Sequence, residues 1–201
     1  MLFRSARFPL AALALATLAT PVLAQNFSAS YKFLEAVRKG DNDEVNKTLG
    51  QPGTSIINTK DSNTGETALH IVAGRSDATY LRFLLAKGAN PNSADNRGDT
   101  PLIVAVNRNF AEGVDLLIAG KANVNQANSS RETPLIRAVQ MRNLEIVNKL
   151  LAAGADPDQR DAIAGKSARD YAKADTRAPA ITKVLTDAPK VQRRSVSGPS
   201  L

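Results

Sequence analysis

Few residues in this 201-residue chain have the types and spacing that catalysis or metal binding requires. It has one histidine, His70, and no cysteine, whereas metal sites are built from clusters of His, Cys or spaced carboxylates. No glycine-rich phosphate loop follows a predicted strand, and no nucleophile elbow is present. We therefore expect no catalytic residue, no metal site and no cofactor, and the residue inventory argues against an enzyme.

Two stretches could be mistaken for calcium loops. Asp41-Asn42-Asp43-Glu44 lacks the alternating ligand spacing, and its charges lie where a helix is expected to begin, which the helix dipole favours. Asp61-Ser62-Asn63-Thr64-Gly65 starts like a calcium loop, but no Glu follows six or seven residues after its glycine. We interpret the second stretch as a turn.

The chain repeats with a period of 33 residues. The starts of three units are Thr67-Ala68-Leu69-His70, Thr100-Pro101-Leu102-Ile103 and Thr133-Pro134-Leu135-Ile136. An apolar pair follows each start: Leu84-Leu85, Leu117-Ile118 and Leu150-Leu151. Each pair leads into one turn: Gly88-Ala89-Asn90-Pro91-Asn92, Lys121-Ala122-Asn123-Val124-Asn125 and Gly154-Ala155-Asp156-Pro157-Asp158. A fixed period of this size indicates stacked supersecondary units.

The repeated residues suit a pair of helices in each unit. A Thr at the start can cap a helix, and Pro is favoured at the first helical position. The apolar residues recur at i, i+3 and i+4, which indicates an amphipathic second helix, and Gly88 and Gly154 suit its C-terminal cap. The middle unit has Lys121 at this cap, although Gly120 could shift the cap by one residue. It also has Gly113 inside its second helix, so we expect it to be the least stable of the three inner units.

The 33-residue pattern of helix start, apolar pair and turn resembles the ankyrin repeat. The pattern of that family is Thr-Pro-Leu-His-x-Ala, then Leu-Leu, then Gly-Ala-Asp-x-Asn. The resemblance implies an all-α solenoid of about five helix-turn-helix units joined by hairpin-like fingers. It extends over residues 25–187, with the following approximate units: full repeats at 61–94, 95–127 and 128–161, and caps at 30–60 and 162–187. It also implies that His70 is structural, forming hydrogen bonds between neighbouring units. Arg169 replaces the leucine of the inner repeats, and we expect a solvent-facing cap there.

The two ends of the chain differ from the repeats. Residues 1–24 have a positive start, an apolar stretch and small residues before Ala24, which predicts a secretory signal cleaved after Ala24. The alternative is an uncleaved anchor, but the apolar stretch is shorter than the roughly 20 residues of a spanning helix. We therefore expect a periplasmic or secreted protein with no stable membrane anchor. Residues 188–201 are predicted to form a disordered basic tail.

The net charge of +7 lies mostly at these ends. Cleavage removes two arginines and leaves +5, of which three charges belong to the tail and about +2 to the repeats. The repeats therefore lack the basic surface that nucleic-acid binding requires, and no nucleic-acid partner is expected.

Ankyrin repeats bind partners mostly on the concave face made by the fingers and the first helices, so the resemblance implies that the partner is another protein. It also implies that this chain is a monomer. The matching positions are Asn63, Thr64, Glu66, Gly74, Arg75, Asn96, Arg97, Asp99, Asn107, Arg108, Ser129, Ser130, Glu132, Gln140 and Met141. Among them, Arg75, Arg97 and Arg108 would form a basic track. One hypothesis is an accessory to a periplasmic or stress-related enzyme. The alternative is an immunity or inhibitor protein against an envelope-directed toxin, and an enzyme or metal-binding protein is least favoured.

Overall fold

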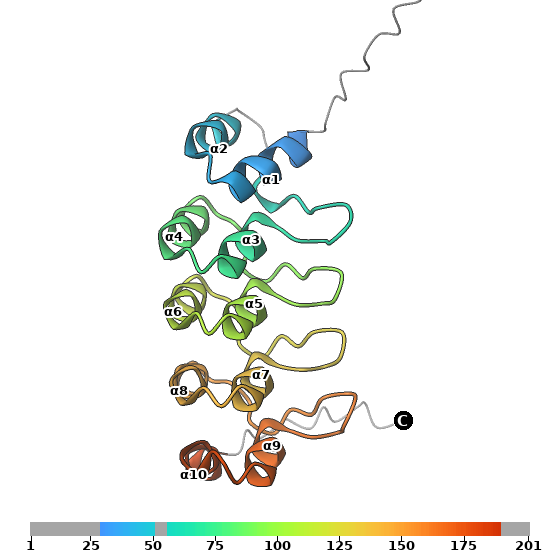
Figure 1. Ribbon diagram of the computed structural model, residues 1–201, viewed down its shortest axis with the longest axis vertical. Helices are drawn as coiled ribbons and strands as arrows, with labels where there is room; N and C mark the ends of the chain where they lie inside the picture. The colour runs from blue at the N-terminus through green and yellow to red at the C-terminus, as the bar shows by residue number, and fades with distance from the viewer. Residues whose placement is uncertain (1–28, 51–55, 190–201) are drawn as a thin grey trace, which may run out of the picture.

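Stacked helix pairs make up the fold (Figure 1) in the computed structural model, which describes residues 29–50 and 56–189. The inner helices are α1 (Ala29–Lys39), α3 (Ala68–Gly74), α5 (Pro101–Asn107), α7 (Pro134–Gln140) and α9 (Ala168–Ala174). The outer helices are α2 (Asn42–Leu49), α4 (Ala78–Ala86), α6 (Ala111–Ala119), α8 (Leu144–Ala152) and α10 (Pro179–Asp187), and a short 3-10 helix, η1, spans Ile56–Asn58. The described ranges contain no β-strand, and the predicted all-α solenoid is confirmed.

The repeated Thr residues begin the inner helices as expected. The Thr100 hydroxyl accepts a hydrogen bond from the backbone N–H of Ile103 at 3.3 Å, and Thr133 accepts one from Ile136 at 3.1 Å. Ser167 takes the same role at the start of α9. These caps satisfy backbone donors that the first turn of a helix leaves without partners. They set where each inner helix starts, and hence where each preceding finger ends.

The core is a continuous seam between the inner and outer layers. The expected outer-helix stripes supply fully buried residues: Leu81, Leu84, Val114, Leu117, Val147 and Leu150. Ala105 and Ala138 of the inner helices are also fully buried, where the two layers approach each other. Helices α4, α6, α8 and α10 pack in series, whereas α2 packs chiefly on α1 and η1. The units therefore contact mainly their neighbours in the stack.

An asparagine ladder joins the turns of successive units. In each step, a side-chain oxygen of one unit accepts a hydrogen bond from a backbone N–H of the next, at 2.7 Å. The three steps are Asn58 to Asn90, Asn92 to Asn123, and Asn125 to Asp156. Because these oxygens recur every 33 or 34 residues, the same polar connection is made at each junction.

Gly113 of α6 lies against the ring of Phe110, three residues before it. A Cβ at Gly113 would lie 2.1 Å from Phe110 Cδ1 and 2.3 Å from Cε1, which is shorter than any van der Waals contact. The glycine therefore makes room for a ring that is itself buried. This packing gives Gly113 a role that the sequence pattern did not indicate, while the expected low stability of the middle unit stays a prediction.

Lys121 ends the outer helix of the same unit without a glycine. Its φ is +69°, in the left-handed region where the two glycines at the equivalent position, Gly88 and Gly154, have φ of +86° and +89°. Gly120 has a φ of −75°. The cap is therefore not shifted by one residue, and Lys121 itself adopts a conformation that is costly for a residue with a Cβ.

Arg169 is buried in the last unit, with only 8 % of its surface exposed. Its guanidinium forms an ion pair with Asp158, where Nε lies 2.9 Å from Oδ1. It also donates to the backbone carbonyls of Leu185 and Ala188, at the end of α10. The predicted solvent-facing position of Arg169 was therefore wrong, because the side chain caps the last helix of the stack from within.

Candidate protein-binding face

The fingers are held by a turn that each of them makes in the same way. The first residue of every described finger is an Asp or Asn whose Oδ1 accepts from the backbone N–H two residues later, at 2.8–3.0 Å. These residues are Asp61, Asp95, Asn128 and Asp161. Asp and Asn favour such turns because their short side chains reach their own backbone. The calcium-like stretch that begins at Asp61 is thus a turn, as expected.

Neighbouring fingers are also connected to one another. The backbone N–H of Asn96 donates to the carbonyl of Thr64 at 3.0 Å, and that of Ser129 donates to the carbonyl of Arg97 at 3.0 Å. In addition, the Asn96 side chain donates to the carbonyl of Asn63 at 2.8 Å. The fingers therefore form one continuous edge, and their side chains are presented at fixed spacing.

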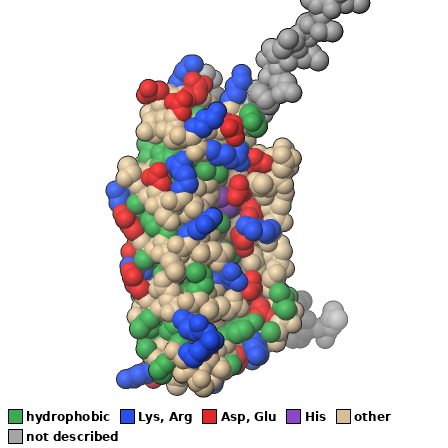
Figure 2. All heavy atoms as spheres, in the orientation of Figure 1, with side chains coloured by type: hydrophobic (Ala, Val, Ile, Leu, Met, Phe, Trp, Pro, Cys, Tyr) green, Lys and Arg blue, Asp and Glu red, His purple; other side chains and the backbone are tan. Residues whose placement is uncertain are grey.

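Between this edge and the inner helices lies a cavity of about 490 Å³, which we call the inner groove. Apolar side chains of Ile71 and Val104 form part of its floor. Its polar lining residues are Arg38, Glu66, His70, Arg75, Arg97, Asn107 and Arg108. Acidic and basic side chains are interspersed on the face that Figure 2 presents. The lining of the groove itself has four arginines and one glutamate, so it is mainly basic.

Arg38 of the first unit was not among the sequence-predicted residues. It donates to Asp61 at 2.7 Å and to Glu35 at 3.1 Å. The hydrogen bond from Arg38, together with those from the finger backbone, lowers the pKa of Asp61 to about 2. Arg38 thus secures the first finger and closes one end of the groove. Arg38 lies at the end of α1, in a cap unit whose repeat pattern is incomplete, so the repeat register did not point to it.

Arg75 lies in the groove as predicted, but its hydrogen bonds are directed to the first unit. Its Nη1 donates to the carbonyl of Val37 at 2.6 Å and to that of Arg38 at 3.0 Å. Its Nη2 lies 3.1 Å from the carboxylate of Asp77. Arg75 therefore connects the first two units, and most of its donors are already used.

Arg97 and Arg108 are the cations of the groove that stay most available to a partner. The Arg97 side chain is 73 % exposed, and its Nη2 lies 3.4 Å from both Asp95 and Asp99. Arg108 is exposed, and within the described ranges its side chain forms no hydrogen bond or ion pair. The continuous basic track expected from Arg75, Arg97 and Arg108 is thus reduced to its last two members.

Two of the predicted acidic residues serve the fingers themselves. Asp99 is only 6 % exposed, and its carboxylate accepts from the Asn128 amide at 3.0 Å. We therefore correct its assignment from direct contact to positioning of the finger. Glu132 accepts from Gln140 at 3.4 Å and lies 3.6 Å from Arg137. It is mostly covered as well.

Arg137 of the fourth unit, which the sequence reasoning missed, joins two predicted positions of its own unit to one of the third unit. It donates to Asn107 at 3.0 Å and to Gln140 at 3.2 Å, in addition to its ion pair with Glu132. Its position in α7 matches that of Ile71 in α3 and Val104 in α5, both at the groove floor. That register was the signal that could have identified it.

The remaining predicted positions lie at the finger tips and at the ends of the inner helices. The exposed ones are Asn63, Thr64, Asn96 and Ser129. The half-buried ones are Glu66, Gly74, Asn107, Ser130, Gln140 and Met141. The groove therefore unites predicted residues of the second and third units, while those of the fourth unit lie beyond its lining.

His70 is buried beneath the groove, where it connects two units. Its Nδ1 accepts from the backbone N–H of Thr67 at 3.1 Å, so the proton must be on Nε2, which lies 2.9 Å from the carbonyl of Asp99. Burial lowers the pKa of His70, which favours this neutral form. The predicted structural role, a hydrogen bond between neighbouring units, is confirmed.

Residues 29–50 and 56–189 hold no group of three or more His, Cys, Asp or Glu side chains arranged to bind a metal ion. They likewise contain no helix with the length and apolarity needed to cross a membrane. The predicted signal at 1–24 and most of the predicted tail lie outside the described residues.

Comparison with known proteins agrees with the repeat pattern. The family model for ankyrin repeats (3 copies) matches residues 33–128 and again residues 81–161. No curated protein matches the sequence significantly. The two family matches together span well over half of the chain, and they coincide with the stacked helix pairs. The chain therefore belongs to the ankyrin-repeat family.

Proposed function

We propose that this protein is exported and binds a partner protein in the inner groove, through Arg97 and Arg108. Ankyrin repeats are protein–protein interaction modules, which supports a protein as the ligand. The observation that carries the proposal is the pairing pattern of the arginines: Arg38 and Arg75 are held by this chain, whereas Arg108 has no partner in the described ranges. Arginine is a frequent anchor of interfaces because it offers several donors in a planar fork.

The fixed spacing of the fingers supports tight recognition. Side chains that are already ordered lose less conformational freedom when a partner binds. The fingers bond to one another through their backbones, and Arg38, Asp61 and Asp99 are held in place. The expected partner surface carries a carboxylate or a row of carbonyl oxygens that accepts from Arg97 and Arg108.

Export rests on the signal pattern of residues 1–24 and on the absence of cysteine from the sequence. An exported interaction module without catalytic residues fits an accessory to an enzyme of the same compartment, such as a stress-related enzyme. Identification of the partner separates this role from that of an immunity or inhibitor protein, because a toxin and a resident enzyme are readily distinguished.

The test uses the chain from Gln25 onward as bait in an extract of the envelope fraction. A captured partner is then titrated by calorimetry against Arg97→Glu/Arg108→Glu and the parent. We expect at least a tenfold loss of affinity, because favourable pairs become repulsive. Neither side chain belongs to the buried core, so the helical circular dichroism spectrum should stay unchanged.

The matched control is Lys183→Glu, which reverses an exposed charge on the outer helix α10. Lys149, also on the outer layer, is unsuitable because its Nζ lies 2.6 Å from Asp115 and joins α8 to α6. Equal affinity of the parent and the arginine variant would refute the groove as the binding site. The same conclusion would follow if only Lys183→Glu weakened binding.

A further inference from the structure

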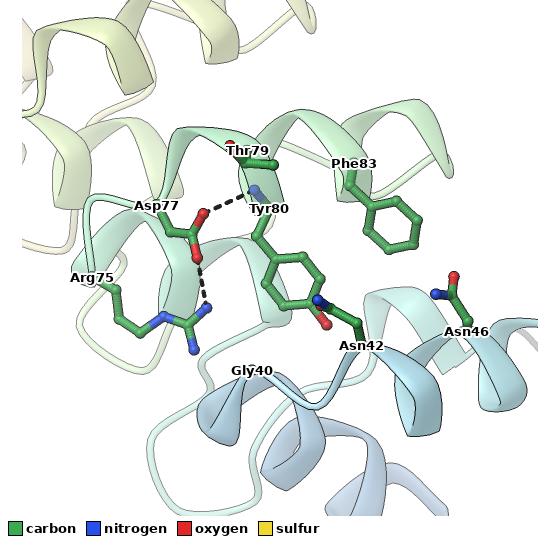
Figure 3. A pocket seen from close by; sticks show the side chains of 8 residues that line it. All are labelled: Gly40, Asn42, Asn46, Arg75, Asp77, Thr79, Tyr80 and Phe83. Atoms are coloured by element: carbon green, nitrogen blue, oxygen red, sulfur yellow. Dashed lines mark hydrogen bonds and ion pairs between the residues drawn. The ribbon is translucent and has the colours of Figure 1, made fainter.

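A second cavity, of about 480 Å³, lies between α2 and α4. One wall consists of Asn42 and Asn46, one turn apart on α2. The opposite wall consists of Thr79, Tyr80 and Phe83 of α4 (Figure 3). We call this cavity the α2–α4 pocket. It exists because α2 packs on α1 and η1 instead of continuing the series of closely packed outer helices.

The hydroxyl of Tyr80 has no hydrogen-bond partner. Tyr80 is 7 % exposed, and its Oη is the one buried side-chain polar atom in the described ranges without a partner. Figure 3 shows its ring directed from α4 toward α2, with the hydroxyl end on the side of Asn42. A buried hydroxyl without a partner is costly to fold, and such groups are rare in native proteins.

The repeat itself does not require a phenol at this position. The residues equivalent to Tyr80 are Gly113 and Ile146, and those equivalent to Phe83 are Leu116 and Lys149. The aromatic pair is therefore particular to the unit that faces the pocket. Its two rings are stacked, with centroids 5.7 Å apart and planes 12° from parallel, and Arg75 lies over the Tyr80 ring, 5.7 Å from its centroid. Because Tyr80 is buried, the half-buried Phe83 supplies the aromatic surface of the pocket.

The charges around the pocket are balanced. Arg75 and Asp77, at its inner end, form an ion pair of 3.1 Å with each other. Lys87 lies over the Phe83 ring, 5.6 Å from its centroid, and is not part of the lining. An ionic ligand would find no unpaired countercharge in the lining. The volume lies within the range of small-molecule sites, about 300–1,000 Å³.

We propose that the α2–α4 pocket binds a neutral pyranose sugar, with an apolar face of the sugar against Phe83 and its hydroxyls on the amides of α2 and the hydroxyl of Tyr80. A pyranose has apolar C–H faces and a rim of hydroxyl groups that both donate and accept. Four neutral polar groups line the pocket: the amides of Asn42 and Asn46 and the hydroxyls of Thr79 and Tyr80. A purely aliphatic or aromatic ligand would leave most of them unsatisfied. The Tyr80 hydroxyl donates to a ligand oxygen once the exposed Asn42 side chain turns aside.

The test exploits the three tyrosines of the chain, Tyr31, Tyr80 and Tyr171. The protein from Gln25 onward is labelled with ¹³C at the tyrosine Cζ, which gives three resonances, and Tyr80→Phe identifies that of Tyr80. Glucose, N-acetylglucosamine and maltose are titrated as neutral probes, and glucuronate and glucosamine as charged ones. We expect a saturable shift of the Tyr80 line with at least one neutral probe, while the Tyr31 and Tyr171 lines stay fixed.

The two amide variants test the opposite wall. Asn42→Ala and Asn46→Ala should each weaken binding about two- to tenfold, the equivalent of one net hydrogen bond. Asn148→Ala, which removes an exposed amide from α8, is the matched control and should bind like the parent. Tyr80→Phe removes only the hydroxyl without a partner, so it should fold at least as well while it binds more weakly. Because this variant lacks the Tyr80 line, its binding is followed at the backbone amide resonance of Phe83.

Several results would overturn the proposal. One is the absence of a saturable Tyr80 shift with every neutral sugar. Others are tighter binding of a charged probe, an equal shift of all three tyrosine lines, or a loss in Asn148→Ala as large as in the α2 variants. A Tyr80 shift caused by the captured protein partner but by no sugar would instead make the pocket a protein contact. The sugar titrations do not depend on the inner groove.

Discussion

Replacement of Gly113 by Ala tests whether its lack of a side chain is a packing requirement. In an isolated helix this change would stabilise by about 0.5–1 kcal/mol, because glycine is a poor helix former. Here the new methyl group would lie 2.1 Å from Phe110 Cδ1, so the ring must move. Overpacking of this kind costs about 1–3 kcal/mol, and complete exposure of a buried Phe costs about the same.

The expected net effect of Gly113→Ala is therefore a loss of about 1–2 kcal/mol in the free energy of unfolding. Removal of the ring should reverse the sign. In a Phe110→Ala background, Gly113→Ala should stabilise by about 0.5–1 kcal/mol, because only the helix preference is left. The two positions should thus show a coupling energy of about 2 kcal/mol.

Urea unfolding of the parent, the two single variants and the double variant, followed by far-ultraviolet circular dichroism, measures this cycle. The chain has no tryptophan, so helical signal is the appropriate probe. A stabilising effect of Gly113→Ala in the parent would refute the packing argument. An equal effect in both backgrounds would refute it as well, because the ring would then be irrelevant to the glycine.

Three further predictions concern the histidine, the last helix and the N-terminus. Burial lowers the pKa of His70 from its usual 6.5, so as the pH falls this histidine is protonated in the unfolded chain before it is protonated in the folded one. The free energy of unfolding should therefore be constant above about pH 6.5 and decrease below it. Urea titrations between pH 8 and 5 should show this decrease in the parent but not in His70→Ala, which should itself be about 1–2 kcal/mol less stable. Arg169→Leu restores the repeat residue but leaves the end of α10 without its donor, so thermal unfolding should reveal a loss of about 1–3 kcal/mol, and a gain would contradict this role. Intact mass of the exported protein should place Gln25 at its N-terminus, whereas a membrane-bound species that retains Met1 would contradict cleavage after Ala24.

The features that depend on local chemistry could be predicted from the sequence. Thr100 and Thr133 identified the helix starts because a capping hydroxyl acts within three residues. The same holds for the apolar stripes and for the glycine turns at Gly88 and Gly154. The position of His70 in the family pattern also implied its hydrogen bond to the next unit.

The errors arose where residues of different elements meet. Nothing in the local sequence indicated that Arg169 reaches both Asp158 and the end of α10. The sequence also gave no indication that Arg75 donates to the backbone carbonyls of Val37 and Arg38, although this pairing decides which cations of the groove are available. The contact of Phe110 with Gly113 was within reach, because positions three apart on a helix are neighbours.

The asparagine ladder has a consequence for how such a chain can change in length. Each junction presents the same oxygen and receives the same N–H, so residues 95–127 begin and end with interchangeable surfaces. A tandem duplication of that segment would join to its neighbours without any new chemistry at the junctions. Gene duplication could therefore lengthen the row of fingers by whole units, and natural variants of different length would keep both end caps unchanged.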